Sequence, residues 1–301
     1  MVTHVSVISQ VEAPTPQEPL AREHFPGAAS RSQMLFAHGF GQTRLAWKQA
    51  ATRLAVQGFT GTTFDARGHG ESRWNRPDEP YEMSQFTDDL ARLARVQQSP
   101  PILVGASMGG LLGLFVQGQA MAQAQPPPFR ALVLVDITPR WETRGVERIL
   151  GFMTAHPLGF ANLDEAADAI AAYLPHRSPR KSPETLQKLL VRGNDGRWRW
   201  HWDPRLIDSI GRRGEELQET LLDAARRITV PTLLISGGRS ELVTEAQVEE
   251  FLELVPHAHH VCLPKATHMV VGDDNDAFTQ TILGFIKALP SGQAHSEGGS
   301  S

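Results

Sequence analysis

The sequence predicts an α/β protein in which a mostly parallel β-sheet carries helices on both faces. Short apolar runs alternate with segments of helical periodicity along most of the 301-residue chain, a rhythm typical of βαβ units. The apolar runs predict strands at Gln33–His38, Gly61–Asp65, Ile102–Ala106, Ala131–Ile137, Thr232–Ser236 and His259–Leu263. The predicted helices are Arg44–Gln57, Phe86–Gln97, Met108–Ala122, Glu245–Leu254 and Ala277–Leu289.

This alternation stops between Arg140 and about Arg226. The stretch contains helical patches such as LDEAADAIAAYL and SPETLQKLLV, several prolines and no convincing buried strand. It lies between two core strands, so a helical insertion here would cover the sheet. Because open α/β sheets bind ligands beyond the carboxyl ends of their strands, we expect this insertion to form a cap over the functional site.

Composition and charge exclude several classes of partner. Lys and Arg total 29 and Asp and Glu total 33, which gives a formal net charge of −4, with neither sign concentrated in a run. Nucleic acid and anionic membranes are therefore not expected as partners. Hydrophobic residues make up 41% of the chain, enough for a sizeable core, but no apolar run reaches the length of a membrane-spanning helix.

The single cysteine and the two chain ends bear on location and order. Cys262 can form no internal disulfide, as is usual in a reducing compartment, and the N-terminal segment lacks the pattern of a secretory signal. We therefore expect a cytoplasmic protein. The C-terminal segment 291–301 is small, polar and glycine-rich, and is predicted to be disordered.

The stretch PILVGASMGG predicts a nucleophilic serine. Gly105-Ala106-Ser107-Met108-Gly109 has the form G-x-S-x-G and lies between a predicted strand and a predicted helix. In this context a tight turn raises the hydroxyl above the sheet, and small neighbours allow the backbone to approach closely. The helix that follows directs free N–H groups at the site. Ser107 is therefore the predicted nucleophile.

A serine hydroxyl needs a base, and His268 is the candidate. It lies after the last predicted strand and before the last helix, and it follows Ser107 in the chain order that this arrangement requires. His69 lies in a loop and is expected to have a structural role. The run His257–His260 lacks the spacing of zinc ligands, so no metal site is predicted.

Two backbone amides are predicted to stabilise the negative charge that develops when the serine attacks a carbonyl. His38-Gly39-Phe40-Gly41 follows an apolar strand, and its glycines let backbone amides approach a ligand. The amide of Phe40 is one expected donor of this oxyanion hole. The other is the amide of Met108, one residue past the serine.

Together these motifs resemble those of the α/β-hydrolase superfamily. The matching segments, in the order found in the family, are HGFGQT, FDARGHGES, GASMGG, LVLVDITPR, PTLLISGG and ATHMV, and they span about residues 33–289. The resemblance implies a core sheet of about eight strands formed by residues 1–139 and 227–290, a helical cap at 140–226 inserted after the sixth strand, and no cofactor. A serine at the elbow implies hydrolysis through an acyl-enzyme.

The triad carboxylate is the point at which the sequence departs from the family pattern. The family usually places an acid in the turn of ISGGRSELV, where this chain has Ser240 and, one residue later, Glu241. Asp136 instead ends the apolar strand of VLVDITP, beside the elbow. Some esterases of the family are similar in combining an acid here with a serine at the later position. Asp136 is therefore the predicted acid and Glu241 the alternative.

The predicted function is hydrolysis of small-molecule carboxylic esters by Ser107, His268 and Asp136, with lactones and thioesters as related substrates. The alternatives are hydrolysis of a carbon–carbon bond in a diketone by the same residues, and a binding protein that has lost turnover, because fold alone does not establish function. The natural substrate and the oligomeric state stay open. So does the role of the cap tryptophans, which could line the site or only pack: Trp141, Trp198, Trp200 and Trp202.

Overall fold

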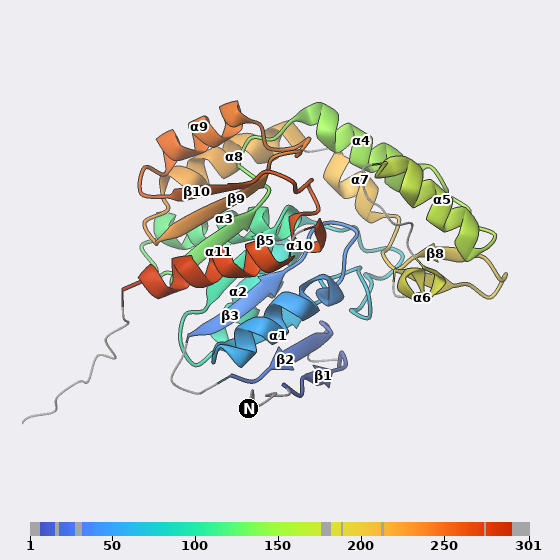
Figure 1. The fold of residues 1–301 in the computed structure, drawn as a ribbon, viewed down its shortest axis with the longest axis horizontal. Helices are drawn as coiled ribbons and strands as arrows, with labels where there is room; N and C mark the ends of the chain where they lie inside the picture. The colour runs from blue at the N-terminus through green and yellow to red at the C-terminus, as the bar shows by residue number, and fades with distance from the viewer. Residues whose placement is uncertain are drawn as a thin grey trace, which may run out of the picture.

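A computed structural model shows an eight-stranded sheet between two layers of helices (Figure 1). The structure describes residues 7–15, 18–27, 32–175, 182–187, 189–211, 214–273 and 275–290. The strands are, in spatial order, β1 (Gln10–Glu12), β2 (Arg22–Phe25), β4 (Thr60–Phe64), β3 (Gln33–Ala37), β5 (Ile102–Ala106), β6 (Ala131–Val135), β9 (Thr232–Gly237) and β10 (His259–Leu263). The ladder from β4 to β10 is parallel, and β1 and β2 add an antiparallel edge. The predicted fold class is confirmed.

All six predicted strands form, while β1 and β2 are strands that the sequence pattern does not predict. The reason is visible in β2, where one of the two buried positions holds a carboxylate instead of an apolar side chain. Glu23 is only 1% exposed, and it accepts hydrogen bonds from Ser9 Oγ at 2.6 Å and from Lys48 Nζ at 3.1 Å. Without an apolar alternation, β2 has no hydrophobic signature.

Helices cover both faces of the sheet, which is why its central strands are apolar throughout. In β6, Val133 packs into the core on one face and Leu132 into the core on the other. On the Val133 side lie η1 (Arg44–Trp47), α1 (Lys48–Val56), α10 (Val270–Asp273) and α11 (Asn275–Ala288). On the Leu132 side lie α2 (Met83–Arg95), α3 (Met108–Ala122), α8 (Gly214–Arg226) and α9 (Glu245–Leu254). The predicted helices all form, within a few residues of their expected ends.

Between β6 and β9 the chain leaves the sheet and forms smaller elements. These are α4 (Thr143–Thr154), α5 (Leu163–Tyr173), α6 (Pro183–Leu186), β7 (Leu190–Arg192), β8 (Trp198–Trp200) and α7 (Leu206–Gly211). Figure 1 shows α4, α5, α6 and β8 lying to one side of the sheet. The antiparallel pair of β7 and β8 is not predicted from the sequence, because only Leu190 of its six residues is buried and no apolar run results.

α8 follows these elements and packs against α3 and α9. The domain limits given above, with a cap at 140–226, stay a prediction. The predicted disordered tail, 291–301, lies outside the described residues. Within the described ranges, no helix combines the length and the apolar character needed to cross a membrane.

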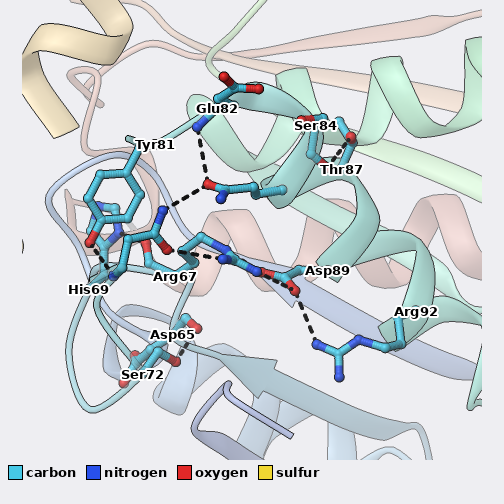
Figure 2. Close-up of polar contacts among 12 residues, drawn as sticks. Asp65, Arg67, His69, Ser72, Tyr81, Glu82, Ser84, Thr87, Asp89 and Arg92 are labelled. Atoms are coloured by element: carbon cyan, nitrogen blue, oxygen red, sulfur yellow. Dashed lines mark hydrogen bonds and ion pairs between the residues drawn. The ribbon is translucent and has the colours of Figure 1, made fainter. Parts of the chain in front are cut away.

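The loop that follows β4 is fixed to the core by polar contacts (Figure 2). Arg67 donates to both carboxylate oxygens of Asp89 in α2, at 3.0 and 3.2 Å. Ser72 Oγ donates to the backbone oxygen of Asp65 at 2.6 Å, and the fully buried Asp65 carboxylate pairs with Arg44. This loop is therefore a firm support for the segments that rest on it.

One segment of the insertion is bonded directly to this loop. The Gly70 amide donates to the backbone oxygen of His201 at 2.8 Å, and the Asp203 amide donates to the backbone oxygen of Gly68 at 2.8 Å. The Tyr81 hydroxyl donates to Asp203 Oδ2 at 2.9 Å. The end of the insertion that follows β8 is thus anchored on the core.

Gly118→Ala is expected to lower the free energy of unfolding. Gly118 lies on α3, where an added Cβ would stand 2.5 Å from the Cβ of Ala224 in α8. Overpacking typically costs about 1–3 kcal/mol, more than the gain of up to ~1 kcal/mol that alanine brings through its helix propensity. Chemical denaturation measures the change.

The matched control is Gly284→Ala in α11, where an added Cβ meets nothing within 4 Å. Only the favourable propensity remains there, so this variant should gain up to ~1 kcal/mol. Equal stabilisation by both substitutions would contradict the close approach of α3 and α8.

Candidate active site

Ser107 occupies a strained turn between β5 and α3. Its φ of 45° and ψ of −116° lie in a region that residues with side chains rarely adopt. Glycines make the turn possible: a Cβ on Gly105 would lie 2.5 Å from the carbonyl oxygen of Gly109, and a Cβ on Gly109 would collide with Ala37. The G-x-S-x-G pattern therefore reflects close backbone contacts that hold the serine at the edge of the sheet.

Asp136 stands at the same edge, directly after β6, and is completely buried. Its carboxylate accepts three hydrogen bonds. Oδ1 accepts from the Gly237 amide at 2.8 Å, and Oδ2 accepts from Ser240 Oγ at 2.5 Å and from His268 Nδ1 at 2.7 Å. Burial of a charge is costly unless it is paired and hydrogen-bonded, and these three donors meet that need.

The alternative acid, Glu241, points elsewhere. Its carboxylate forms an ion pair with Arg148, and 48% of its side chain is exposed. The sequence leaves two candidates for the hydrogen-bond partner of His268 Nδ1. In this structure the partner is Asp136.

His268 lies in the turn between β10 and α10, with 22% of its side chain exposed. Because an ionised carboxylate only accepts hydrogen bonds, Nδ1 carries the proton donated to Asp136, and the lone pair is left on Nε2. His268 and Ser107 line the same cavity. In this arrangement an imidazole can act as a base toward a serine hydroxyl.

Two buried histidines shape the loop that contains Phe40. His38 Nδ1 donates to the Gly39 oxygen at 2.8 Å, and its Nε2 accepts from the Ala66 amide at 2.9 Å. His69 Nε2 accepts from the Gly41 amide at 3.2 Å. The amide of Phe40 has no acceptor among the hydrogen bonds between described residues, and so stays available to a ligand.

These contacts require neutral imidazoles, because a protonated ring nitrogen cannot accept. Burial lowers the pKa of His38, and burial together with the neighbouring His38 holds the pKa of His69 well below its usual value. A third histidine, His201, is buried beside them, and burial is the main cause that lowers its pKa to about 4. All three are therefore uncharged at neutral pH.

The amide of Met108 begins α3 beside Ser107, where the first N–H groups of a helix have no partner within the helix. The Met108 side chain is partly buried against the core. The predicted oxyanion-hole donors, the amides of Phe40 and Met108, thus lie in the loop after β3 and at the start of α3. Their function stays a prediction.

The cavity that Ser107 and His268 line has a volume of about 710 Å³. Core residues Phe40, Ser107 and His268 line one part of it, and insertion residues Phe152, Trp200 and Trp202 line another. Trp141 and Trp198 are not among the lining residues that the structure describes. Two of the four cap tryptophans therefore face the cavity, and the large apolar wall suits an organic substrate.

Ser240 Oγ donates to Asp136 Oδ2, a contact that the motifs do not predict. Ser240 stands in the turn after β9, where the family usually has the acid. The sequence signal for this contact is the combination of a serine at that position with a carboxylate at the end of β6. In the described part of the chain, no group of three or more His, Cys, Asp or Glu side chains is placed to hold a metal ion.

The chain belongs to the alpha/beta hydrolase family, whose model matches residues 34–281. It is 29% identical over 260 residues to the 2-(acetamidomethylene)succinate hydrolase of Mesorhizobium japonicum, covering 85% of this chain and 88% of that protein. It is 27% identical over 246 residues to the 3-hydroxybutyrate-oligomer hydrolase of Cupriavidus necator, covering 78% and 82%. A crystal structure of E-2-(acetamidomethylene)succinate hydrolase superposes with a TM-score of 0.74 at 25% identity, covering 94% of this chain and all of that one. The resemblance inferred from the motifs is confirmed, and the chain is a hydrolase.

Ser240→Ala is expected to lower kcat roughly tenfold, because a hydrogen bond to a charged group is worth about 1.5–3 kcal/mol. The loss should fall on kcat rather than on KM, because Ser240 donates to the carboxylate that holds His268 and does not line the cavity. Ser240→Thr keeps the hydroxyl and should restore kcat. An equal fall in kcat for both variants would contradict a role of the hydroxyl as donor.

The free energy of unfolding is expected to fall as the pH drops from 6.5 toward 5. The folded-state pKa values of His38, His69 and His201 lie below the unfolded value of about 6.5, so in this range the unfolded chain binds more protons. Each such histidine contributes a slope of up to about 1.4 kcal/mol per pH unit. Urea denaturation at several pH values measures the slope.

His201→Phe should reduce the slope of the unfolding free energy against pH by the contribution of one histidine, which is up to about 1.4 kcal/mol per pH unit. A slope unchanged by this substitution would show that His201 is not held neutral by its surroundings.

Proposed function

We propose that this protein is a serine hydrolase that cleaves carboxylic esters through an acyl-enzyme. The proposal rests on the arrangement of three side chains at one edge of the sheet. Ser107 sits on its strained elbow, and the buried Asp136 carboxylate accepts a hydrogen bond from Nδ1 of His268, which lines the same cavity as the serine.

In the first half of the reaction, His268 Nε2 takes the proton of Ser107 Oγ as the oxygen attacks the ester carbonyl carbon. The amides of Phe40 and Met108 donate to the oxyanion of the tetrahedral intermediate. Asp136 stabilises the imidazolium that has formed. When the carbon–oxygen bond of the ester breaks, His268 returns its proton to the leaving alcohol, and the acyl group stays on Ser107.

In the second half, water replaces the alcohol. His268 takes a proton from the water, whose oxygen attacks the acyl carbon, and Ser107 regains its proton as the carboxylic acid leaves. Thioesters and lactones fit the same steps, because each has a carbonyl with a leaving thiol or alkoxide. Support for ester-type substrates comes from the relative named for oligomers of 3-hydroxybutyrate.

Ser107→Ala is expected to abolish ester hydrolysis and to leave the fold intact, because the elbow accepts a small side chain. Loss of a triad member typically lowers the rate by roughly 10⁴-fold or more. Hydrolysis of a panel of p-nitrophenyl esters measures the loss, and circular dichroism checks the fold. A fluorophosphonate probe should label the wild type at Ser107 and leave the variant unlabelled.

Labelling at another residue, or full esterase activity in Ser107→Ala, would contradict the serine mechanism. A set of vinylogous diketones assayed beside the esters tests the carbon–carbon alternative. Turnover of the diketones without the esters would replace ester cleavage with that reaction. Binding of substrate without either turnover would indicate a receptor that has kept the fold.

A further inference from the structure

The rim of the cavity is positively charged, although the chain as a whole carries a net charge of −4. Arg148, Arg239 and Lys265 line it, and Glu241 is the single carboxylate among the described residues that line the cavity. In the part of the chain that the structure describes, no carboxylate pairs with Arg239 or Lys265. A cleft with apolar walls and charges of one sign concentrates ligands of the opposite sign, so this mouth favours anionic substrates.

Arg148 and Glu241 meet across this rim from different parts of the fold. Arg148 lies on α4 in the insertion, Glu241 follows β9 in the core, and the two side chains form an ion pair. Arg148 also donates to the backbone oxygen of Tyr173 at 3.1 Å, and its guanidinium lies 5.4 Å from the centre of the Tyr173 ring. Tyr173 would therefore keep the guanidinium in place if the carboxylate of Glu241 moved away.

The Arg148–Glu241 pair is easily exchanged. The two side chains are 47% and 48% exposed, and ion pairs at such sites add little net stability. A second carboxylate could replace Glu241 on the guanidinium nitrogen that now pairs with it, while Glu241 returned to solvent. Arg239 and Lys265 would add attraction for the newcomer.

We infer that the acyl part of the substrate ends in a carboxylate, which binds Arg148 in place of Glu241 while the ester carbonyl lies at Ser107. The inference rests on the proposed function and adds the class of its substrate: half-esters of dicarboxylic acids and related anionic esters. The cavity of about 710 Å³ falls in the usual range for small-molecule sites and accommodates such an acyl chain. Arg148 is then a specificity-determining residue, and Glu241 is an internal competitor of the substrate.

The test compares monoethyl glutarate with ethyl valerate, which have acyl chains of equal length and differ in the terminal carboxylate. The readout is the ratio of their kcat/KM values, measured by pH-stat titration. The wild type should prefer the glutarate, roughly tenfold, and the preference should shrink as salt is added, because the contact is partly exposed. Arg148→Gln should remove most of the preference through KM. Arg148→Lys should remove part of it, because lysine keeps the charge but not the planar guanidinium that also contacts Tyr173.

Glu241→Gln separates this inference from a purely structural ion pair. Removing the competitor should raise the preference for the glutarate severalfold, the opposite direction to Arg148→Gln. If the pair only held the insertion on the core, both substitutions would change the ratio in the same direction. The matched control is Arg199→Gln, because Arg199 also pairs with a carboxylate, Asp195, and does not line the cavity. Its ratio should equal that of the wild type.

Binding without turnover keeps this test independent of the proposed reaction. Calorimetric titration of the Ser107→Ala protein with the same two esters should show tighter binding of monoethyl glutarate, weakened by adding Arg148→Gln and strengthened by adding Glu241→Gln. Equal binding of the two esters, or tighter binding of ethyl valerate, would overturn the inference. Failure of the serine mechanism would appear instead as ester turnover that survives Ser107→Ala.

Discussion

The site depends on one buried carboxylate with three donors. Asp136 emerges after β6 with a φ of 49°, in the left-handed region that an aspartate adopts more readily than most residues. Its oxygens can be satisfied only if β9 lies beside β6 in register, because Gly237 and Ser240 follow from that strand. The turn after β10 must then bring His268 to the remaining lone pair. Three strand ends are thus tied together at the point where the elbow serine stands.

Around Asp136, buried polar residues hold the neighbouring loops in place, through contacts that the sequence does not reveal. Neutral His38 and His69 fix the loop whose Phe40 amide is left free, and their neutrality follows from their burial. The loop after β4 that carries His69 also anchors the insertion, through the contacts of Gly70 and Asp203. The loop that contains Phe40 and the insertion therefore share one support, the loop after β4, which holds these two walls of the cavity in a fixed relation to each other.

The parts of the fold that bury apolar residues could be predicted from the sequence, because apolar periodicity reports burial. The six apolar strands, the helices around them and the elbow motif belong to this part. β2 and the pair of β7 and β8 could not, because a buried Glu23 and half-exposed tryptophans and arginines give no apolar pattern. At the site, chain order predicted His268, but the choice between Asp136 and Glu241 needed the geometry of a turn that one residue redirects. The sequence also could not place Arg148 at the cavity, because its position depends on how the insertion folds over the core.

The central claim is that Asp136 alone holds the proton of His268 Nδ1, and NMR observes that proton directly. In protein labelled with ¹⁵N-histidine, a strongly hydrogen-bonded imidazole proton resonates far downfield and couples to its own nitrogen. The structure predicts such a signal from His268 in the wild type and in Glu241→Gln, and its loss in Asp136→Asn, with the fold retained in all three. A signal that survives in Asp136→Asn and disappears in Glu241→Gln would contradict the account.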